Sequence, residues 1–567
     1  MRNRALRFTV YAAIGVAVGL LVAAFDYVAV EVVLHRVTAL DTWQLAIAPG
    51  LGLGVTALVL RYIGRGAPTA TSEEFINAYH DRHDRLRLSY LPARLLAGVA
   101  TVGGSGALGL EGPSIYAGGT VGASFQHRLR WLFAGKDGRM LMVAGAAAGV
   151  AAIFKTPATG VLFALEVPYK GDVARRALLP ALIASATSYL TFVSIIGTTP
   201  IFALTRREIE TDAGTVIAER VLDFDLGELA AAAILGLVAG LGALLFAKAM
   251  LTVKRIEKSV AWWRRWLVAS VLLGVLVPVS LRVFDEPLST GEPDDLLRWV
   301  TRSPDSTVAL LAALFVVRMV ATLATLGGGG VGGVFIPLAI QGVILGGLAG
   351  EVLLELDLVE INTATILFPG IGIAAFLGAG YRTPLASVMF VAESTGQASF
   401  VVPALIATAV SQVVMGSTSV SAYQRDTRTG HLERRFGLPL RSALIRDVHT
   451  VPSRTSIAEF VWDHALVHRE VDVPVVDDGR FLGMAHLHDV NDIGREHWSD
   501  LAVSEMMHTG GPSARLSWTL RQATEIMERE DLEVLPVVDE AGTFLGVVTA
   551  DAILRLDEIL DETEGGR

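Results

Sequence analysis

The sequence AGVAAIFKTPATGVLFALE at residues 148–166 says most about the fold, because the chain repeats its pattern. Residues 375–393 read AFLGAGYRTPLASVMFVAE, and each copy has an aromatic residue, a base, threonine, proline and then a glutamate. A second pair of strings lies upstream, GLEGP at 109–113 and GVFIP at 333–337. Two halves with matching interrupted segments are typical of transport proteins whose site lies between the halves.

Long runs without a charged side chain predict a chain that crosses a membrane, since about 20 apolar residues span a bilayer. The runs at 319–350 and 394–424 are long enough to hold more than one helix each. Glycine and proline interrupt many shorter runs, which predicts broken helices around a buried site. Charge-free runs of about this length include 8–25, 229–247, 319–350, 361–381 and 394–424.

Most of the net charge of the chain lies after residue 420. Residues 421–567 hold 15 arginines, no lysine and 27 acidic residues, whereas the first 420 hold 32 basic and 30 acidic residues. The chain is 52% hydrophobic and only 18% charged, which excludes a disordered chain. The charge balance argues against nucleic acid as a partner, which needs a basic surface. The chain has no cysteine, and we find no metal-ligand spacing, P-loop or catalytic constellation. We therefore expect no metal, no cofactor and no enzymatic activity.

The acidic tail contains a repeat of its own. PVVD at 474–477 followed by FLG at 481–483 recurs as PVVD at 536–539 followed by FLG at 544–546. Short β-branched runs beside helical stretches at 455–468 and 519–531 predict a tandem α+β module. The predicted organisation is a membrane domain at 1–425, a linker at 426–440, and two copies at 441–500 and 501–563.

Glu111 is the only acidic or basic residue between Arg94 and His127. A charge in such an apolar setting is a functional hypothesis by default. Pro113 suits the first turn of a helix, which places the carboxylate where unpaired N–H groups bind anions. The alternative is a glutamate that caps a helix at a membrane face.

A second helix start at 333–337 offers backbone donors without a charged side chain, which suits an anion that must also leave. The ring of a lone Phe335 would by itself indicate core or lipid packing. The backbone groups expected around the anion are those of Gly109, Leu110, Gly112, Gly333, Val334, Phe335 and Ile336.

These strings resemble the CLC family of chloride channels and transporters, as does AGAAAGVAAIFKTP at 144–157, and the tail resembles the paired CBS domains of many members. The resemblance implies an all-α polytopic membrane domain of two inverted halves, followed by an α+β CBS pair. It also implies a homodimer with one anion pathway per subunit. Glu111 matches the gating glutamate, and Phe335 and Ile336 match residues that lend backbone amides. Tyr423 best matches the pore tyrosine; the alternative is a tyrosine at the membrane interface.

Two positions depart from the family pattern in the membrane domain. The string GRGAP at 64–68 has Arg65 before Gly66, where the family has a pore serine. Arg65 would attract anions, hold them too long, or point away toward the interface. Val167 follows Glu166 where exchangers commonly carry a second glutamate, and valine cannot relay a proton. Val167 therefore favours a channel, and we expect a structural role for Glu166.

The tail also departs from the pattern that binds a ribose in CBS domains. His486 replaces the hydroxyl residue before Asp489 in the first copy, and the second copy has Thr549 and Asp551 but alanine at the expected acidic position. We expect a dimerising and regulatory module rather than a nucleotide sensor.

The sequence thus predicts chloride conduction gated by Glu111, in a multi-pass protein of the plasma membrane. Arg2, Arg4 and Arg7 favour a cytoplasmic N-terminus, with the tail on the same side. Three alternatives remain open: a proton-coupled chloride exchanger, a fluoride exporter, and a membrane-anchored sensor whose working part is the CBS pair.

Overall fold

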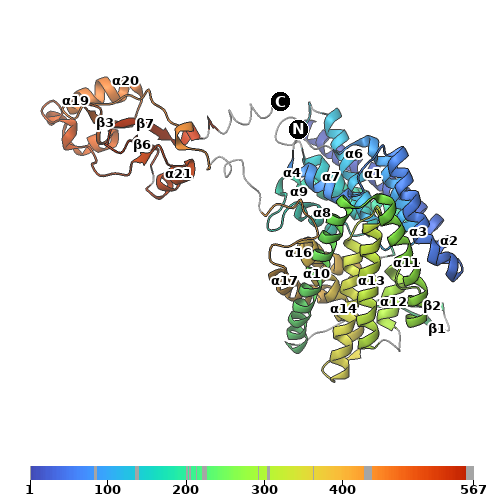
Figure 1. Cartoon of the computed structure of the whole chain (residues 1–567). Coiled ribbons are helices and arrows are strands. Elements are labelled where there is room, and N and C mark those ends of the chain that lie inside the picture. The colour runs from blue at the N-terminus through green and yellow to red at the C-terminus, as the bar shows by residue number, and fades with distance from the viewer. Residues whose placement is uncertain are drawn as a thin grey trace. The chain divides into compact units, whose positions relative to one another are not determined.

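The structure is a computed structural model that divides into two compact units, residues 1–428 and 429–567, each described here by itself (Figure 1). Most of the predicted linker at 426–440 and the end of the second predicted copy lie outside the described residues. The structure describes residues 2–81, 86–129, 131–133, 139–199, 202, 206–211, 214–219, 226–291, 293–302, 307–361, 363–426, 437–530, 532–553 and 555–556.

The first half of the first unit is helical. Its elements are α1 (Arg2–Tyr27), a π-helical segment (Val28–Leu34), α2 (His35–Thr38), α3 (Thr42–Leu58), a π-helical segment (Val59–Ile63), α4 (Thr71–His80), a 3-10 turn (Leu88–Tyr90), α5 (Leu91–Gly103), α6 (Glu111–Arg128), α7 (Met140–Phe154), α8 (Pro157–Glu166), a 3-10 turn (Arg175–Ala177) and α9 (Leu178–Ile196).

An antiparallel hairpin of β1 (Arg206–Thr211) and β2 (Gly214–Glu219) precedes the second half. The second half consists of α10 (Leu226–Ser259), α11 (Trp262–Phe284), α12 (Pro293–Arg302), α13 (Val308–Gly327), α14 (Phe335–Glu355), a π-helical segment (Thr363–Leu367), α15 (Phe368–Tyr381), α16 (Pro384–Thr395), a 3-10 turn (Ala398–Phe400) and α17 (Val401–Met415).

Nine helical segments of the described residues are long and apolar enough to cross a membrane. The run at 319–350 holds parts of two helices, because the chain leaves α13 at a glycine string where Gly329 has φ +90°. The run at 394–424 holds the last two residues of α16, a 3-10 turn and α17. Gly416, with φ +58°, ends that helix, and the described residues up to 424 form no further one.

The internal repeat has a structural meaning. Lys155 ends α7 and Arg382 ends α15, both in the left-handed region with φ +57° and +59°. Pro157 and Pro384 then begin α8 and α16 at the first helical position. The N–H group that proline lacks is not needed there, because the first N–H of a helix has no partner within the helix. The base–threonine–proline string is therefore a helix end joined directly to a helix start, once in each half.

The two halves also share a close helix contact. A side-chain carbon on Gly118 of α6 would clash with the backbone oxygen of Gly145 on α7, and the reverse also holds. Gly342 of α14 and Gly372 of α15 have the same reciprocal relation in the second half. Small residues of this kind let helix backbones approach closely in membranes.

The second unit contains two similar α+β copies. The first pairs β3 (Asp472–Asp477) with β4 (Arg480–His486), and the second pairs β6 (Val534–Val538) with β7 (Phe544–Thr549), each with one bulge. A short β5 (Ala514–Arg515) runs parallel to β6. The predicted helix at 455–468 is a continuous helical stretch from α19 (Ile457–Glu459) through a π-helical turn (Phe460–Ala465) to α20 (Leu466–His468), and that at 519–531 is α21 (Leu520–Arg529). Single 3-10 turns lie at Leu440–Ser442, Leu487–Asp492, Arg495–His497 and Val503–Glu505.

The two hairpin turns of the second unit are joined by backbone hydrogen bonds. Phe481 N donates to Gly542 O at 3.1 Å, and Phe544 N donates to Gly479 O at 2.9 Å. The rings of Phe481 and Phe544 stack with their centroids 6.0 Å apart. The sequence repeat therefore corresponds to an approximate two-fold relation between the copies.

Candidate functional site

The helices α6 and α14 begin side by side inside the first unit. Gly109 N donates to Gly333 O at 3.0 Å, and Gly333 N donates to Gly109 O at 2.8 Å. This two-bond bridge joins the loop before α6 in one half to the loop before α14 in the other. The two starts that the sequence predicted are thus brought together by backbone contacts between the glycines.

The Glu111 side chain occupies the first turn of α14, the helix of the opposite half. Its Oε1 accepts hydrogen bonds from Phe335 N at 2.6 Å and Ile336 N at 3.4 Å. The residue is completely buried, and Oε2 has no hydrogen-bond partner among the described residues. The unpaired N–H groups and the helix dipole at such a position favour a negative charge. The carboxylate therefore sits where a bound anion would be stabilised.

Aromatic rings surround the start of α14. The Phe335 ring lies 4.2 Å from the ring centroid of Phe154, 5.3 Å from that of Phe163 and 5.0 Å from that of Phe390. All four side chains are buried. Phe335 thus has two parts: its N–H faces Glu111, while its ring packs in the core as the simpler interpretation of the sequence predicted.

Two hydroxyl groups that the sequence reasoning missed lie near this point. Tyr381, at the end of α15, is buried, with its ring edge-on to Phe163 at 5.3 Å and its hydroxyl facing the Val334 backbone and the Ser72 side chain. Thr71 begins α4, and its Oγ1 lies 2.6 Å from where a side-chain carbon on Gly112 would be. That oxygen is buried and has no partner among the described residues.

Comparison with known proteins identifies the fold that holds this site. The family described as voltage gated chloride channel matches residues 52–416, which is more than half of the chain. The chain belongs to the CLC family. Two matches to the CBS domain cover residues 440–494 and 503–558. The predicted family and fold class are therefore confirmed, and the protein is a multi-pass integral membrane protein of an anion-transporting family.

Solved CLC structures share this fold at low sequence identity. One similar structure is a CLC-type fluoride/proton antiporter, with TM-score 0.60 and 22% identity, covering 75% of this chain and 98% of the other. A slow cyanobacterial Cl−/H+ antiporter gives TM-score 0.59 and 22% identity over 72% and 94%. A eukaryotic CLC transporter gives TM-score 0.60 and 16% identity over 97% and 99%.

Three residues predicted to contact the anion in the CLC domain lie outside this buried cluster. Tyr423 is 46% exposed, and its N–H donates to the Ser421 hydroxyl at 3.4 Å. The neighbouring Gln424 turns inward instead and donates to Tyr381 O at 2.7 Å. Arg65 and Gly66 are exposed in a turn before α4, with φ +50° and +81°. Thr71, at the start of α4 just after this turn, is buried instead.

Glu166 lies in the CLC domain as a cap on another helix. Its Oε1 and Oε2 accept from Leu385 N at 3.2 Å and Ala386 N at 2.9 Å, in the first turn of α16. Val167 beside it is buried, and its backbone oxygen accepts from the Gln424 amide at 2.9 Å. The structural role expected of Glu166 thus has a specific geometry, and its partners are backbone groups of the opposite half.

The CBS residues singled out in the sequence pair with other residues of the second unit. His486 Nδ1 lies 2.7 Å from Asp472 Oδ1, and Asp489 lies 2.9 Å from His508 Nε2 and 3.1 Å from His488 Nε2. In the second copy, the Thr549 hydroxyl accepts from Ala552 N at 3.1 Å, and the Asp551 carboxylate pairs with Arg555 at 3.1 Å.

Proposed function

We propose that this CLC protein conducts chloride passively and that Glu111 gates the pathway. The observation that carries the proposal is the 2.6 Å contact between Glu111 Oε1 and Phe335 N. A carboxylate and a chloride ion cannot use the same donors at once. Protonation of Glu111, or its displacement by an incoming anion, would free those N–H groups.

Tyr381 and Thr71 would provide the next donors along the pathway. Both are buried close to the start of α14 or of α6, and both carry a hydroxyl hydrogen that an anion can accept. In this proposal Tyr381 takes the part that the sequence had suggested for Tyr423, and Thr71 takes that of the missing pore serine. Neutral donors hold an anion weakly enough for it to leave.

Val167 supports conduction without proton coupling. Its side chain is buried at the end of α8 and has no group that can bind a proton. Proton-coupled chloride exchange is the second candidate, because two of the similar structures are those of proton antiporters. Glu73 of α4 supports it as well, since this carboxylate lies within electrostatic reach of Tyr381.

The reversal potential of the purified protein in a planar bilayer decides between the two. Under a fixed chloride gradient, we expect the potential to stay at the chloride equilibrium value when a pH gradient is added. A shift with pH would establish exchange, and Glu73→Gln would then be expected to abolish that shift.

Glu111→Gln tests the gate separately. We expect higher anion flux and a weaker dependence on pH, since the amide cannot be deprotonated. Glu355→Gln, at the exposed end of α14, is the matched control. Unchanged flux and pH response in a folded Glu111→Gln protein would overturn the gating role.

We further propose a homodimer in the plasma membrane with both termini in the cytoplasm. Family membership supports the dimer, and the basic residues Arg2, Arg4 and Arg7 support the orientation. The predicted boundaries at 425, 440, 500 and 563 remain proposals. The departures at His486 and Ala552 from the ribose-binding pattern support a regulatory CBS pair without bound nucleotide. Cross-linking of the full chain tests the dimer.

A further inference from the structure

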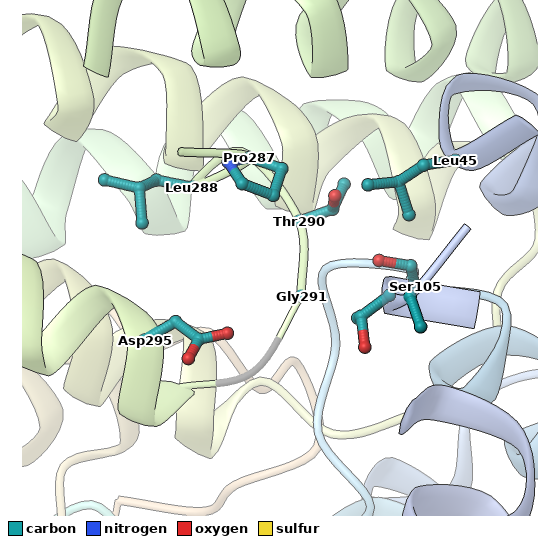
Figure 2. A pocket seen from close by; sticks show the side chains of 9 residues that line it. Leu45, Ser105, Pro287, Leu288, Thr290, Gly291 and Asp295 are labelled. Atoms are coloured by element: carbon teal, nitrogen blue, oxygen red, sulfur yellow. The ribbon is translucent and has the colours of Figure 1, made fainter. Parts of the chain in front are cut away.

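A cavity of about 290 Å³ lies in the first unit, at the end opposite the N-terminus of α1. Its wall includes Thr38 and Ala39, which follow the 34-residue helical segment Ala5–Thr38. That segment is roughly 50 Å long, enough to reach the opposite face of the domain. Figure 2 shows Ser105, Leu45 and Thr290 close together on the wall and Asp295 further away.

The wall of this cavity carries hydroxyl groups that have no hydrogen-bond partner among the described residues. Ser105 and Thr290 are 1% and 3% exposed, and their Oγ and Oγ1 have no partner among the described residues. The buried hydroxyl of Ser289, next in sequence to Thr290, is in the same state. Buried polar groups of this kind are normally hydrogen-bonded, so these donors indicate a bound species.

A buried cation lies directly behind the same wall. Arg318 of α13 is 4% exposed, and its Nη1 donates to Leu288 O, a wall residue, at 3.1 Å. The ion pairs formed within the described part of the chain include none to Arg318. A buried charge without a counter-ion is strongly unfavourable. The guanidinium thus disfavours a cation in the cavity and favours a negative charge.

We propose that this cavity binds a small monovalent inorganic anion, at a site separate from that of Glu111. The hydroxyls of Ser105 and Thr290 donate to it, and the Arg318 guanidinium balances its charge. The rim includes Asp295, which is ion-paired with Arg298, and the exposed Glu286 nearby. This acidic rim opposes multivalent anions more than monovalent ones, so halide is expected to bind in preference to sulfate.

The site has a direct structural link to the gate. Ser105 lies in the left-handed region with φ +63°, in the loop that connects α5 to Glu111. A non-glycine residue persists in this conformation only where its surroundings hold it. The bound anion would hold Ser105 and so support the loop that places Glu111.

Bromide diffraction of the full-length protein tests the proposal. We expect an anomalous peak between Ser105 and Thr290 in the wild type and its loss in the double variant Ser105→Ala/Thr290→Val. The matched control is Thr301→Val on α12, whose hydroxyl already donates to Leu297 O at 2.8 Å. A peak beside Phe335 N reports on the Glu111 site separately. Absence of the cavity peak in the wild type, or its persistence in the double variant, would overturn the proposal.

A measurement in solution covers the case in which the variant does not crystallise. Chloride is expected to raise the melting temperature of the wild type and of Thr301→Val. The double variant should need about tenfold more chloride for the same rise, as expected when hydrogen bonds to a charged group are lost. Sulfate at the same ionic strength should have a smaller effect. Equal chloride dependence in all three proteins would contradict the proposal.

Discussion

Glu166 and Glu393 each cap the start of the helix that carries the other, across the two halves of the CLC domain. Glu166, at the end of α8, accepts from the first turn of α16, and Glu393, on α16, accepts from Ala158 N at 2.9 Å and Thr159 N at 2.7 Å in the first turn of α8. These two residues are the glutamates of the sequence repeat. The repeat is thus retained in the structure as a reciprocal pair of contacts rather than as two independent motifs.

We expect Glu166→Gln and Glu393→Gln each to lower the melting temperature of the purified protein. An amide has one acceptor oxygen and no charge, so each change weakens two bonds to a helix start, at a cost of about 1–3 kcal/mol. Glu355→Gln is the exposed control. Melting temperatures equal to that of the control would show that the reciprocal caps contribute little to stability.

Tyr381→Phe should weaken anion binding without disturbing the fold. The change removes one hydroxyl donor and keeps the ring that packs on Phe163. Loss of one hydrogen bond to an ion predicts about a tenfold increase in the chloride concentration that half-saturates flux. The exposed Tyr423 offers the matched control, Tyr423→Phe. The assignment fails if Tyr423→Phe, and not Tyr381→Phe, changes the half-saturating concentration.

Gly145→Ala should destabilise the CLC domain. The added methyl group would meet the backbone oxygen of Gly118, which cannot move without separating α6 from α7. Overpacking of this kind typically costs about 1–3 kcal/mol. Gly171→Ala is the control, because its added carbon would lie at an ordinary 3.5 Å from the nearest atom, Asp426 O. Similar yield and melting temperature for both variants would argue against a tight contact.

Acid should loosen the first CBS copy through three histidines. His449 Nε2 lies 2.6 Å from His464 Nδ1, and the rings of His449 and His468 stack at 3.9 Å. Burial, and then the charges of His468 and His464, hold the pKa of His449 below its usual value. The unfolded chain therefore takes up a proton near pH 6.5 that the folded chain resists, so this stabilisation is present above about pH 6.5 and declines below it.

Hydrogen exchange of the full-length protein measures this effect. Protection factors for residues 440–470 are expected to fall between about pH 7.5 and about pH 5.5, after correction for the intrinsic rate. His449→Gln should reduce that fall, whereas His497→Gln, at an exposed position, should leave it intact. A pH response that is identical in the two variants would rule out the histidine cluster as its cause.

The sequence predicted the features that depend on local chemistry. Helix starts are indicated by Pro157, by Pro384 and by the glycine string before Phe335. In the structure, α8, α16 and α14 begin at these residues. Glu111 stood out because a lone carboxylate among apolar residues has few explanations. The family resemblance predicted the same helical architecture, and the same role for Glu111, over the whole membrane domain.

The remaining parts of the site depend on contacts between distant residues. Tyr381 and Thr71 are separated by 310 positions, and no local pattern says that Tyr381 approaches the start of α14 and Thr71 that of α6. Tyr423 was chosen by its place near the end of the membrane domain, but Gln424 is the side chain that turns inward. A signal for Tyr381 did exist: it occupies the position of the buried Phe154 in the repeat.

In the proposed pathway past Glu111, the bridge between Gly109 and Gly333 restricts how the opening can occur. Separating the two loops would break both hydrogen bonds of the bridge at once, in an interior that has little water to replace them. Rotation of the Glu111 side chain about its own torsions leaves both bonds intact. The backbone around the proposed gate is therefore rigid, and only the Glu111 side chain needs to move. Opening should then show a shallow temperature dependence, unlike that of a gate in which whole helices must slide.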